Sequence, residues 1–169
     1  TMAMRIALIA PQHGRVAIVK ARGLSILPKW LAMPSAGRAP LVDVIRYAEP
    51  ATVNGLVFMD SPGFDPCSAT GQIASGANLI AFTTGRGSAF GAQPAPSLKL
   101  SSNSDVGRRM KDDIDLDCGS ILDGRSTVES MGLEIFERLL AVASGEPTKS
   151  ELQGYGRFEF VPWNTGAIL

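Results

Sequence analysis

The sequence has few of the residues that build disulfide frameworks and zinc sites. It contains two cysteines, Cys67 and Cys118, and one histidine, His13, in 169 residues. Two cysteines so far apart exclude a disulfide-rich scaffold or a zinc knuckle, and they favour a reduced, cytoplasmic protein. A single histidine in a turn is more often solvated than catalytic, although a role as base or ligand stays open for His13.

The sequence also lacks net charge and long apolar runs. Sixteen Lys and Arg residues balance sixteen Asp and Glu residues, so the formal net charge is zero. No overall field draws such a chain onto nucleic acid or an acidic membrane, and neither is predicted as a partner. No apolar run reaches the roughly 20 residues that cross a bilayer, so we predict no membrane span.

What the sequence contains is a series of short apolar runs separated by helical patterns, typical of an α/β domain with helices on both faces of a parallel sheet. The predicted strands are 5–10, 16–19, 56–59, 79–82 and 97–100. The predicted helices are 41–48, 66–77, 104–111 and 128–142. Ser126 and Glu129 form a predicted capping box for the last helix, whose apolar stripe is expected to face the core. The aromatic tail from Ser150 is predicted to lie over the domain as an extended arm or edge strand.

A glycine-rich turn directly follows the predicted buried strand 79–82. Thr83, Thr84 and Ser88 supply hydroxyl groups, and glycines permit backbone angles that other residues avoid. Arg86 offers a planar guanidinium that suits a carboxylate or a phosphate. Residues 83–91 are therefore predicted to form an anion-binding loop.

Polar loops also follow two other predicted strands, at residues 60–65 and 101–103. Parallel strands end at one edge of a sheet, so the three loops are expected to line a common pocket for a small organic acid. Asp65 is the expected cap of the helix that starts at Pro66. In its first turn, Cys67 has two open interpretations: a thiolate or ligand with a lowered pKa, or an inert buried thiol.

An acidic segment, Asp112 to Gly119, concentrates four carboxylates and a cysteine. In an extended segment, Asp113, Asp115 and Asp117 would lie on one side, where a cation would relieve their repulsion. Two interpretations stay open: an oxygen-rich divalent metal site and a solvated acidic loop.

From about Pro40 onward, the sequence resembles the carboxyl-terminal part of the altronate and galactarate dehydratases, a sugar-acid lyase family that also includes a sulfolactate sulfo-lyase subunit. The resemblance rests on six segments: APLVDVIRYAEP (39–50), GLVFMDSPGFDPCSATGQ (55–72), GANLIAFTTGRGSAFG (76–91), PAPSLKLSSN (94–103), DIDLDCGSILDG (113–124) and FVPWNTGAIL (160–169). It implies a Rossmann-like, mainly parallel sheet with flanking helices, as a partial domain. It also implies removal of water from an aldonic or aldaric acid to give a keto-deoxy acid, assisted by Fe²⁺, with Mn²⁺ or Mg²⁺ as alternatives.

The resemblance also suggests roles for individual residues. Arg86, with the backbone of Thr84, Gly85 and Gly87, would hold the substrate carboxylate, and Lys99 would act as general base if burial lowers its pKa. Further substrate contacts are expected from Ser88 and Asn103. The expected acid and metal-binding groups are Asp60, Asp65, Asp115, Asp117 and Cys67.

The expected domain division has a boundary after residue 38. Residues 1–38 match the family poorly and are interpreted as a divergent or non-family leader, whereas 39–169 correspond to the carboxyl-terminal half of the catalytic domain. If catalytic groups belong to another part of the domain, the chain would be an inactive fragment or binding module that retains the carboxylate-binding loop. Association with itself or with a complementary chain is expected in either case.

Overall fold

The computed structural model describes residues 5–10, 15–20, 40–62 and 64–164. The prediction for His13 therefore lies outside the described residues. The strands are β1 (Arg5–Ala10), β2 (Arg15–Lys20), β3 (Leu41–Ile45), β4 (Gly55–Met59), β5 (Leu79–Thr84), β6 (Ser97–Ser101) and β7 (Leu116–Asp117). The helices are α1 (Asp65–Ala74), α2 (Ser104–Arg109), α3 (Val128–Ala143) and α4 (Lys149–Leu152), with a 3₁₀-helix at Cys118–Ile121. None of these helices has the length and apolar character that a bilayer crossing requires.

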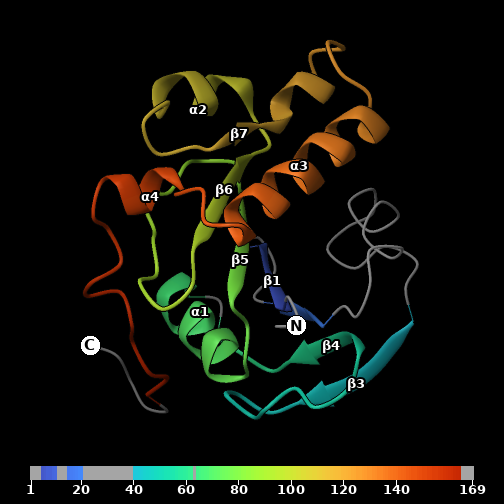
Figure 1. The fold of residues 1–169 in the computed structure, drawn as a ribbon, viewed down its shortest axis with the longest axis vertical. Coiled ribbons are helices and arrows are strands. Elements are labelled where there is room, and N and C mark those ends of the chain that lie inside the picture. The colour runs from blue at the N-terminus through green and yellow to red at the C-terminus, as the bar shows by residue number, and fades with distance from the viewer. Residues whose placement is uncertain (1–4, 11–14, 21–39, 63, 165–169) are drawn as a thin grey trace.

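The strands form one sheet in the order β3-β4-β2-β1-β5-β6-β7. β2 is antiparallel to both of its neighbours, β1 and β4, whereas all other neighbouring strands are parallel. Every strand except β2 therefore runs in the same direction. This mainly parallel sheet with flanking helices confirms the predicted Rossmann-like α/β class (Figure 1).

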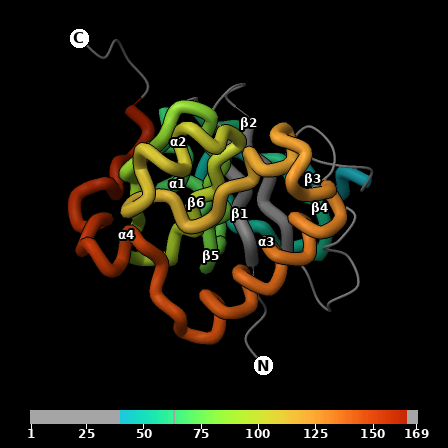
Figure 2. Tube along the Cα trace, turned by 90° about the horizontal axis from the view of Figure 1, so that it is seen from above, coloured from blue at the N-terminus to red at the C-terminus, as the bar shows by residue number. Residues whose placement is uncertain are grey.

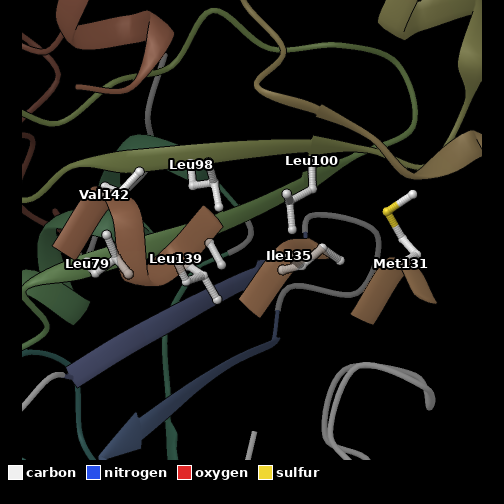
Figure 3. Packing of buried hydrophobic residues seen from close by; sticks show 8 residues of the cluster. Leu79, Leu98, Leu100, Met131, Ile135, Leu139 and Val142 are labelled. Carbon is white, nitrogen blue, oxygen red and sulfur yellow. The ribbon is translucent and has the colours of Figure 1, made fainter. Parts of the chain in front are cut away.

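Helix α3 covers one face of the sheet at β5 and β6. Side chains alternate between the two faces of a strand, so Leu79 and Ala81 point to the same side as Leu98 and Leu100 of the next strand. The stripe on α3 that packs against them comprises Met131, Ile135, Leu139 and Val142. Figure 3 shows these α3 side chains directed at the two strands. The predicted helix and its core-facing stripe are confirmed.

The opposite face of the sheet packs against α1 and the segment around Phe90. Ile80 and Phe82 of β5 contact Ala69 of α1, and the rings of Phe82 and Phe90 stack with centroids 5.6 Å apart. A Cβ atom at Gly71 would overlap the ring of Tyr47, so α1 packs closely against Tyr47.

The prediction of an extended arm from Ser150 is confirmed in part: residues 150–152 belong to α4, and the described residues after them pass over the domain as a non-helical segment. The Val161 N–H donates to the Thr70 hydroxyl of α1 at 2.8 Å, and Trp163 meets the ring of Tyr47 edge to face. Figure 1 shows this last segment, drawn in red, passing beside α1.

Three local predictions differ from the structure. Residues 41–45 form β3, not a helix, because pairing with β4 overrides a helical spacing in a segment rich in β-branched residues. Phe64, not Asp65, is the N-cap of α1 and makes no side-chain capping bond. The capping box of α3 joins Thr127 to Ser130, one residue later than predicted.

Candidate carboxylate-binding site

The three predicted polar loops lie at one edge of the sheet. β4, β5 and β6 share a direction, so Asp60, Thr84 and Ser101 all stand at carboxyl ends of strands on the same side. The carboxyl ends of β5 and β6 are joined directly, because the Ser102 N–H, just after β6, donates to the Thr84 carbonyl of β5 at 3.0 Å. The three loops share the predicted side of the sheet, but β2 and β1 separate β4 from β5, so only the loops after β5 and β6 are neighbours and the predicted common pocket of all three is not formed by adjacent strands. Figure 2 looks onto this end of the molecule and shows the segment after β5 beside α2.

Internal hydrogen bonds and close packing hold the loop after β5. The Thr84 hydroxyl accepts the N–H of Gly87 at 3.0 Å, and the Ser88 hydroxyl accepts the N–H of Phe90 at 3.1 Å. Gly87 has φ +102°, and a Cβ atom there would overlap the sulfur of Met110. Since the Gly87 N–H is used within the loop, Thr84 and Gly87 shape the loop, while Gly85 and Arg86 lie between them.

Two arginines meet at this loop. The Arg109 guanidinium, at the end of α2, donates to the Arg86 carbonyl at 3.1 Å, and both side chains are exposed. In the described part of the chain, the ion pairs involve Arg108, Arg125 and Arg138, and neither Arg86 nor Arg109 pairs with a carboxylate. Two exposed cations that pair with no carboxylate among the described residues make this end of the molecule suited to an external carboxylate. Arg109 was not predicted from the sequence as a site residue. The feature that could have indicated it is the pair of arginines, Arg108 and Arg109, at the end of the short helix α2.

Lys99 lies in the middle of β6 and is fully buried. Its ammonium donates to the Phe90 carbonyl at 3.1 Å. Burial lowers the pKa of Lys99, and the nearby negative charges of Asp115, Asp113 and Glu159 oppose that shift. The predicted effect of burial on this lysine is confirmed. The residues from Phe90 to Ala95 pack on the same face of the sheet as the lysine, so its amine lies beneath the loop, not at the surface.

The acidic segment is built into the fold through its carboxylates. Asp115 accepts the Lys99 N–H at 2.7 Å and the Lys149 N–H at 2.8 Å, which joins β6 to α4. Asp117 accepts the Gly119 N–H at 2.9 Å and the Ser101 hydroxyl at 3.2 Å, and it lies 3.8 Å from Arg125. Residues 111–113 form a turn, so the alternation expected of an extended segment does not occur. Both aspartates have clear structural partners.

The other expected ligands do not assemble a metal centre. Across the described residues, no group of three or more His, Cys, Asp or Glu side chains is placed to hold a metal ion. Asp60 is exposed at the end of β4, and Asp65 is half-buried in the first turn of α1, where burial raises the pKa of its carboxyl group. Asn103 caps α2, its side-chain oxygen accepting the Asp105 N–H at 2.9 Å. The residues described here do not fit a complete metal site.

The structure favours the second interpretation of Cys67. The thiol is buried in the first turn of α1 and donates to the Pro162 carbonyl of the tail at 3.6 Å. Burial raises the pKa of this thiol, contrary to the lowered pKa of a thiolate. Cys67 is therefore a protonated packing residue that the tail covers.

Fold and loop geometry together define a class: an α/β domain with a cationic, glycine-rich loop at the carboxyl edge of its sheet. The family comparison is more specific. Residues 21–168 match the model of the family described as D-galactarate/Altronate dehydratase, C-terminal, and the chain belongs to this family.

Three curated relatives illustrate the membership. The chain is 32% identical over 115 residues, 68% of its length, to galactarate dehydratase (L-threo-forming) of Escherichia coli (strain K12), covering 22% of that protein. It is 31% identical over 134 residues, 78% of its length, to altronate dehydratase of Bacillus subtilis (strain 168), covering 27% of that protein. It is 34% identical over 115 residues, 68% of its length, to (2R)-sulfolactate sulfo-lyase subunit beta of Chromohalobacter salexigens, covering 30% of that protein. The chain thus spans about a quarter of the length of these relatives.

Proposed function

We propose that this chain supplies the carboxylate-binding part of a sugar-acid dehydratase, which removes water from an aldonic or aldaric acid to give a keto-deoxy acid. The observation that carries the proposal is the pair Arg86, on the loop after β5, and Arg109, at the end of α2: both are exposed, they are in contact, and neither has a carboxylate partner among the described residues. The family membership supplies the substrate class. The domain boundary after residue 38 and a cytoplasmic location stay predictions.

The chemistry explains what such a site has to provide. Loss of a proton next to a carboxylate gives an enediolate, whose negative charge needs fixed positive groups before the neighbouring hydroxyl can leave. Arg86 and Arg109 would hold the carboxylate and this charge. Asp65, with a pKa raised by burial, retains its proton to a higher pH and so suits the role of acid toward the departing hydroxyl.

Lys99 is our proposed general base. Its lowered pKa increases the fraction of neutral amine at a given pH, which is what proton abstraction requires. Because its amine is buried against the Phe90 carbonyl, the segment around Phe90 has to move for the amine to reach a substrate.

Assistance by a divalent cation, with Fe²⁺ favoured over Mn²⁺ or Mg²⁺, stays a family-level prediction. The described residues do not assemble three ligands, so a bound cation would need groups from elsewhere. No step of the mechanism proposed here passes through a metal.

One observation favours the alternative of a binding module without catalysis. The chain covers only 22% to 30% of the length of the relatives compared above. Catalytic groups supplied by another part of the domain, or by a complementary chain, would leave this chain able to bind a sugar acid without converting it.

Binding and turnover of galactarate and altronate test the proposal. We expect either acid to raise the melting temperature, and Arg86→Ala and Arg109→Ala each to weaken binding about tenfold or more, since each removes a charged hydrogen bond. Anaerobic assays with Fe²⁺ would then detect the keto-deoxy acid. Binding without product supports the module, whereas an unchanged affinity in both arginine variants would contradict the carboxylate site.

Arg138→Ala provides the matched control. Arg138 lies on α3 and pairs with Glu146 on the surface, so its loss removes one positive charge away from the loop. A surface ion pair contributes about 0 to 1 kcal/mol to stability, and this variant should bind the acids as the unaltered chain does.

A further inference from the structure

The amine of Lys99 is covered by the segment from Phe90 to Ala95, which we call the lid. Lys99 is paired with Phe82 of the neighbouring strand β5, and its ammonium donates to the Phe90 carbonyl at 3.1 Å. The Phe90 ring stacks on the Phe82 ring, and Ala92 and Ala95 are buried in the same cluster. Lys99 has 0% of its surface exposed, so a reagent or substrate reaches the amine only when the lid moves.

A second segment, residues 148–156, packs against the lid, and we call it the strap. The Gln93 N–H donates to the Gly156 carbonyl at 3.2 Å. A Cβ atom at Gly156 would lie 2.7 Å from the Gln93 nitrogen, and a Cβ atom at Gly91 would lie 2.9 Å from the Cβ of Ser150. Strap and lid thus approach so closely at two points that a side chain on either glycine forces them apart.

The strap is anchored to β6, the strand that carries Lys99. One carboxylate oxygen of Asp115 accepts the Lys99 N–H at 2.7 Å, and the other accepts the Lys149 N–H at 2.8 Å. The Ser150 hydroxyl donates to the Ser97 carbonyl at 3.4 Å. These contacts form a closed ring from the Lys99 backbone through Asp115, the strap and the lid, back to the Lys99 amine. The lid therefore lifts only if its contacts with the strap break or the strap leaves β6.

We propose that the strap is a latch that holds the lid closed and so controls access to the Lys99 amine. The inference rests on the proposed function, in which the segment around Phe90 moves before Lys99 can act as base. Arg86 precedes the lid, in a turn that the Gly87 N–H closes on the Thr84 hydroxyl at 3.0 Å. None of the strap contacts described above involves this turn, so the lid opens while Arg86 stays in position to hold a carboxylate.

Acylation of the lysine amines of the full chain by an N-hydroxysuccinimide ester of acetate, followed by peptide mass spectrometry, tests the latch. Lys111 is exposed and serves as the reference amine in the same sample. In the unaltered chain, Lys99 should react at least about a hundredfold more slowly than Lys111, because its reaction waits for a local opening. Gly156→Ala drives a Cβ atom into the lid and should speed Lys99 acylation at least about tenfold, with Lys111 unchanged.

Two further variants make the test specific. Gly154→Ala is the matched control, because Gly154 also lies in the strap with a positive φ of +72°, but a Cβ atom there would meet nothing within 4 Å. This variant carries a similar backbone strain and should keep Lys99 protected. Gly91→Ala disturbs the contact with Ser150 at a residue without a positive φ, and it should expose Lys99 even if Gly156→Ala fails to fold.

Hydrogen exchange of the α3 amides distinguishes a local opening from unfolding of the domain. Faster Lys99 acylation in Gly156→Ala or Gly91→Ala, with α3 still protected, supports the latch. Faster acylation that accompanies loss of α3 protection overturns it, as does an equal increase in Gly154→Ala. Slow acylation of Lys99 in both lid-contact variants, or acylation of Lys99 as fast as that of Lys111 in the unaltered chain, also overturns it.

These measurements use no sugar acid, so their result is separate from that of the proposed function. A lid released as expected in a chain that binds neither galactarate nor altronate contradicts the carboxylate site and leaves the latch intact. Binding of either acid by a chain whose Lys99 stays slow in both variants contradicts the latch and leaves the carboxylate site intact.

Discussion

The two ends of the sheet differ in how they are covered. At β5 and β6, α3 packs on one face and α1 with the Phe90 segment on the other, and even Lys99 is fully buried. At the other end, β3 is an edge strand, and its Val44 is 62% exposed although it is apolar. The burial of a side chain in this molecule therefore depends on the layers around its strand more than on its hydrophobicity.

The comparison also explains where a site can form. The loop after β5 is held by α2 through Met110 and Arg109, and the segment that follows it is held by α4 through Ser150, which a Cβ atom at Gly91 would contact. A loop fixed on several sides keeps its cationic groups in place without reordering when a ligand binds. The exposed β3 end has fewer such supports, and its only buried β3 side chain is Ile45.

The largest effect is expected at the carboxyl edge of the covered end. A Cβ atom at Gly119 would overlap the backbone nitrogen of Ser104 and lie 2.7 Å from the carbonyl carbon of Asn103. Backbone atoms cannot yield as a flexible side chain does, so Gly119→Ala should destabilise the fold by about 4 kcal/mol or more, as measured by urea unfolding.

Gly124→Ala is the control for that substitution. Gly124 has φ +70°, and a Cβ atom there would meet nothing within 4 Å, so only backbone strain of about 1–2 kcal/mol is expected. Equal losses in the two variants would contradict the close packing of the 3₁₀-helix against α2.

Truncating one side chain at each end of the sheet measures the difference in cover directly. Leu139 of α3 is 3% exposed within the core, and Leu139→Ala should lose about 2–5 kcal/mol because a cavity remains. Val44→Ala at the edge should change stability by no more than about 0.5 kcal/mol. Leu133→Ala, on the exposed side of α3, should also have a small effect, and thermal unfolding of the three variants would compare them. A large loss in Val44→Ala would show that β3 is covered in solution.

The smallest effect concerns the pH dependence of stability at Lys99. Its folded pKa is lowered by burial below the ordinary value of 10.5, so the unfolded chain binds more protons between the two values. Stability from this group therefore rises as pH increases from the folded pKa to 10.5, and it is lowest below that window. Lys99→Met should lose this rise in urea unfolding, whereas Lys111→Met, at an exposed lysine, should keep it. Identical pH profiles for Lys99→Met and the unaltered chain would contradict the buried ammonium.

Some features of the fold and site could be predicted from local patterns. The apolar runs at β5 and β6 identified buried strands, and the spacing on α3 identified its packed face. The polar loops after β4, β5 and β6 were correctly expected at one edge, because parallel strands share a direction. The helix predicted over residues 41–48 was wrong. A short, mostly apolar segment such as 41–45 is compatible with both helical and strand periodicity, and only pairing with a neighbouring strand decides between them.

The sequence alone determined the buried strands, the amphipathic helix and the glycine-rich loop with Arg86, because each depends on residues close together in the chain. Only the tertiary structure decided that β3 is a strand, that Arg109 contacts Arg86 across 23 positions, and that Gln72 is enclosed without a hydrogen-bond partner among the described residues. These features depend on which elements become neighbours, and the packing of the whole sheet and its helices sets that arrangement.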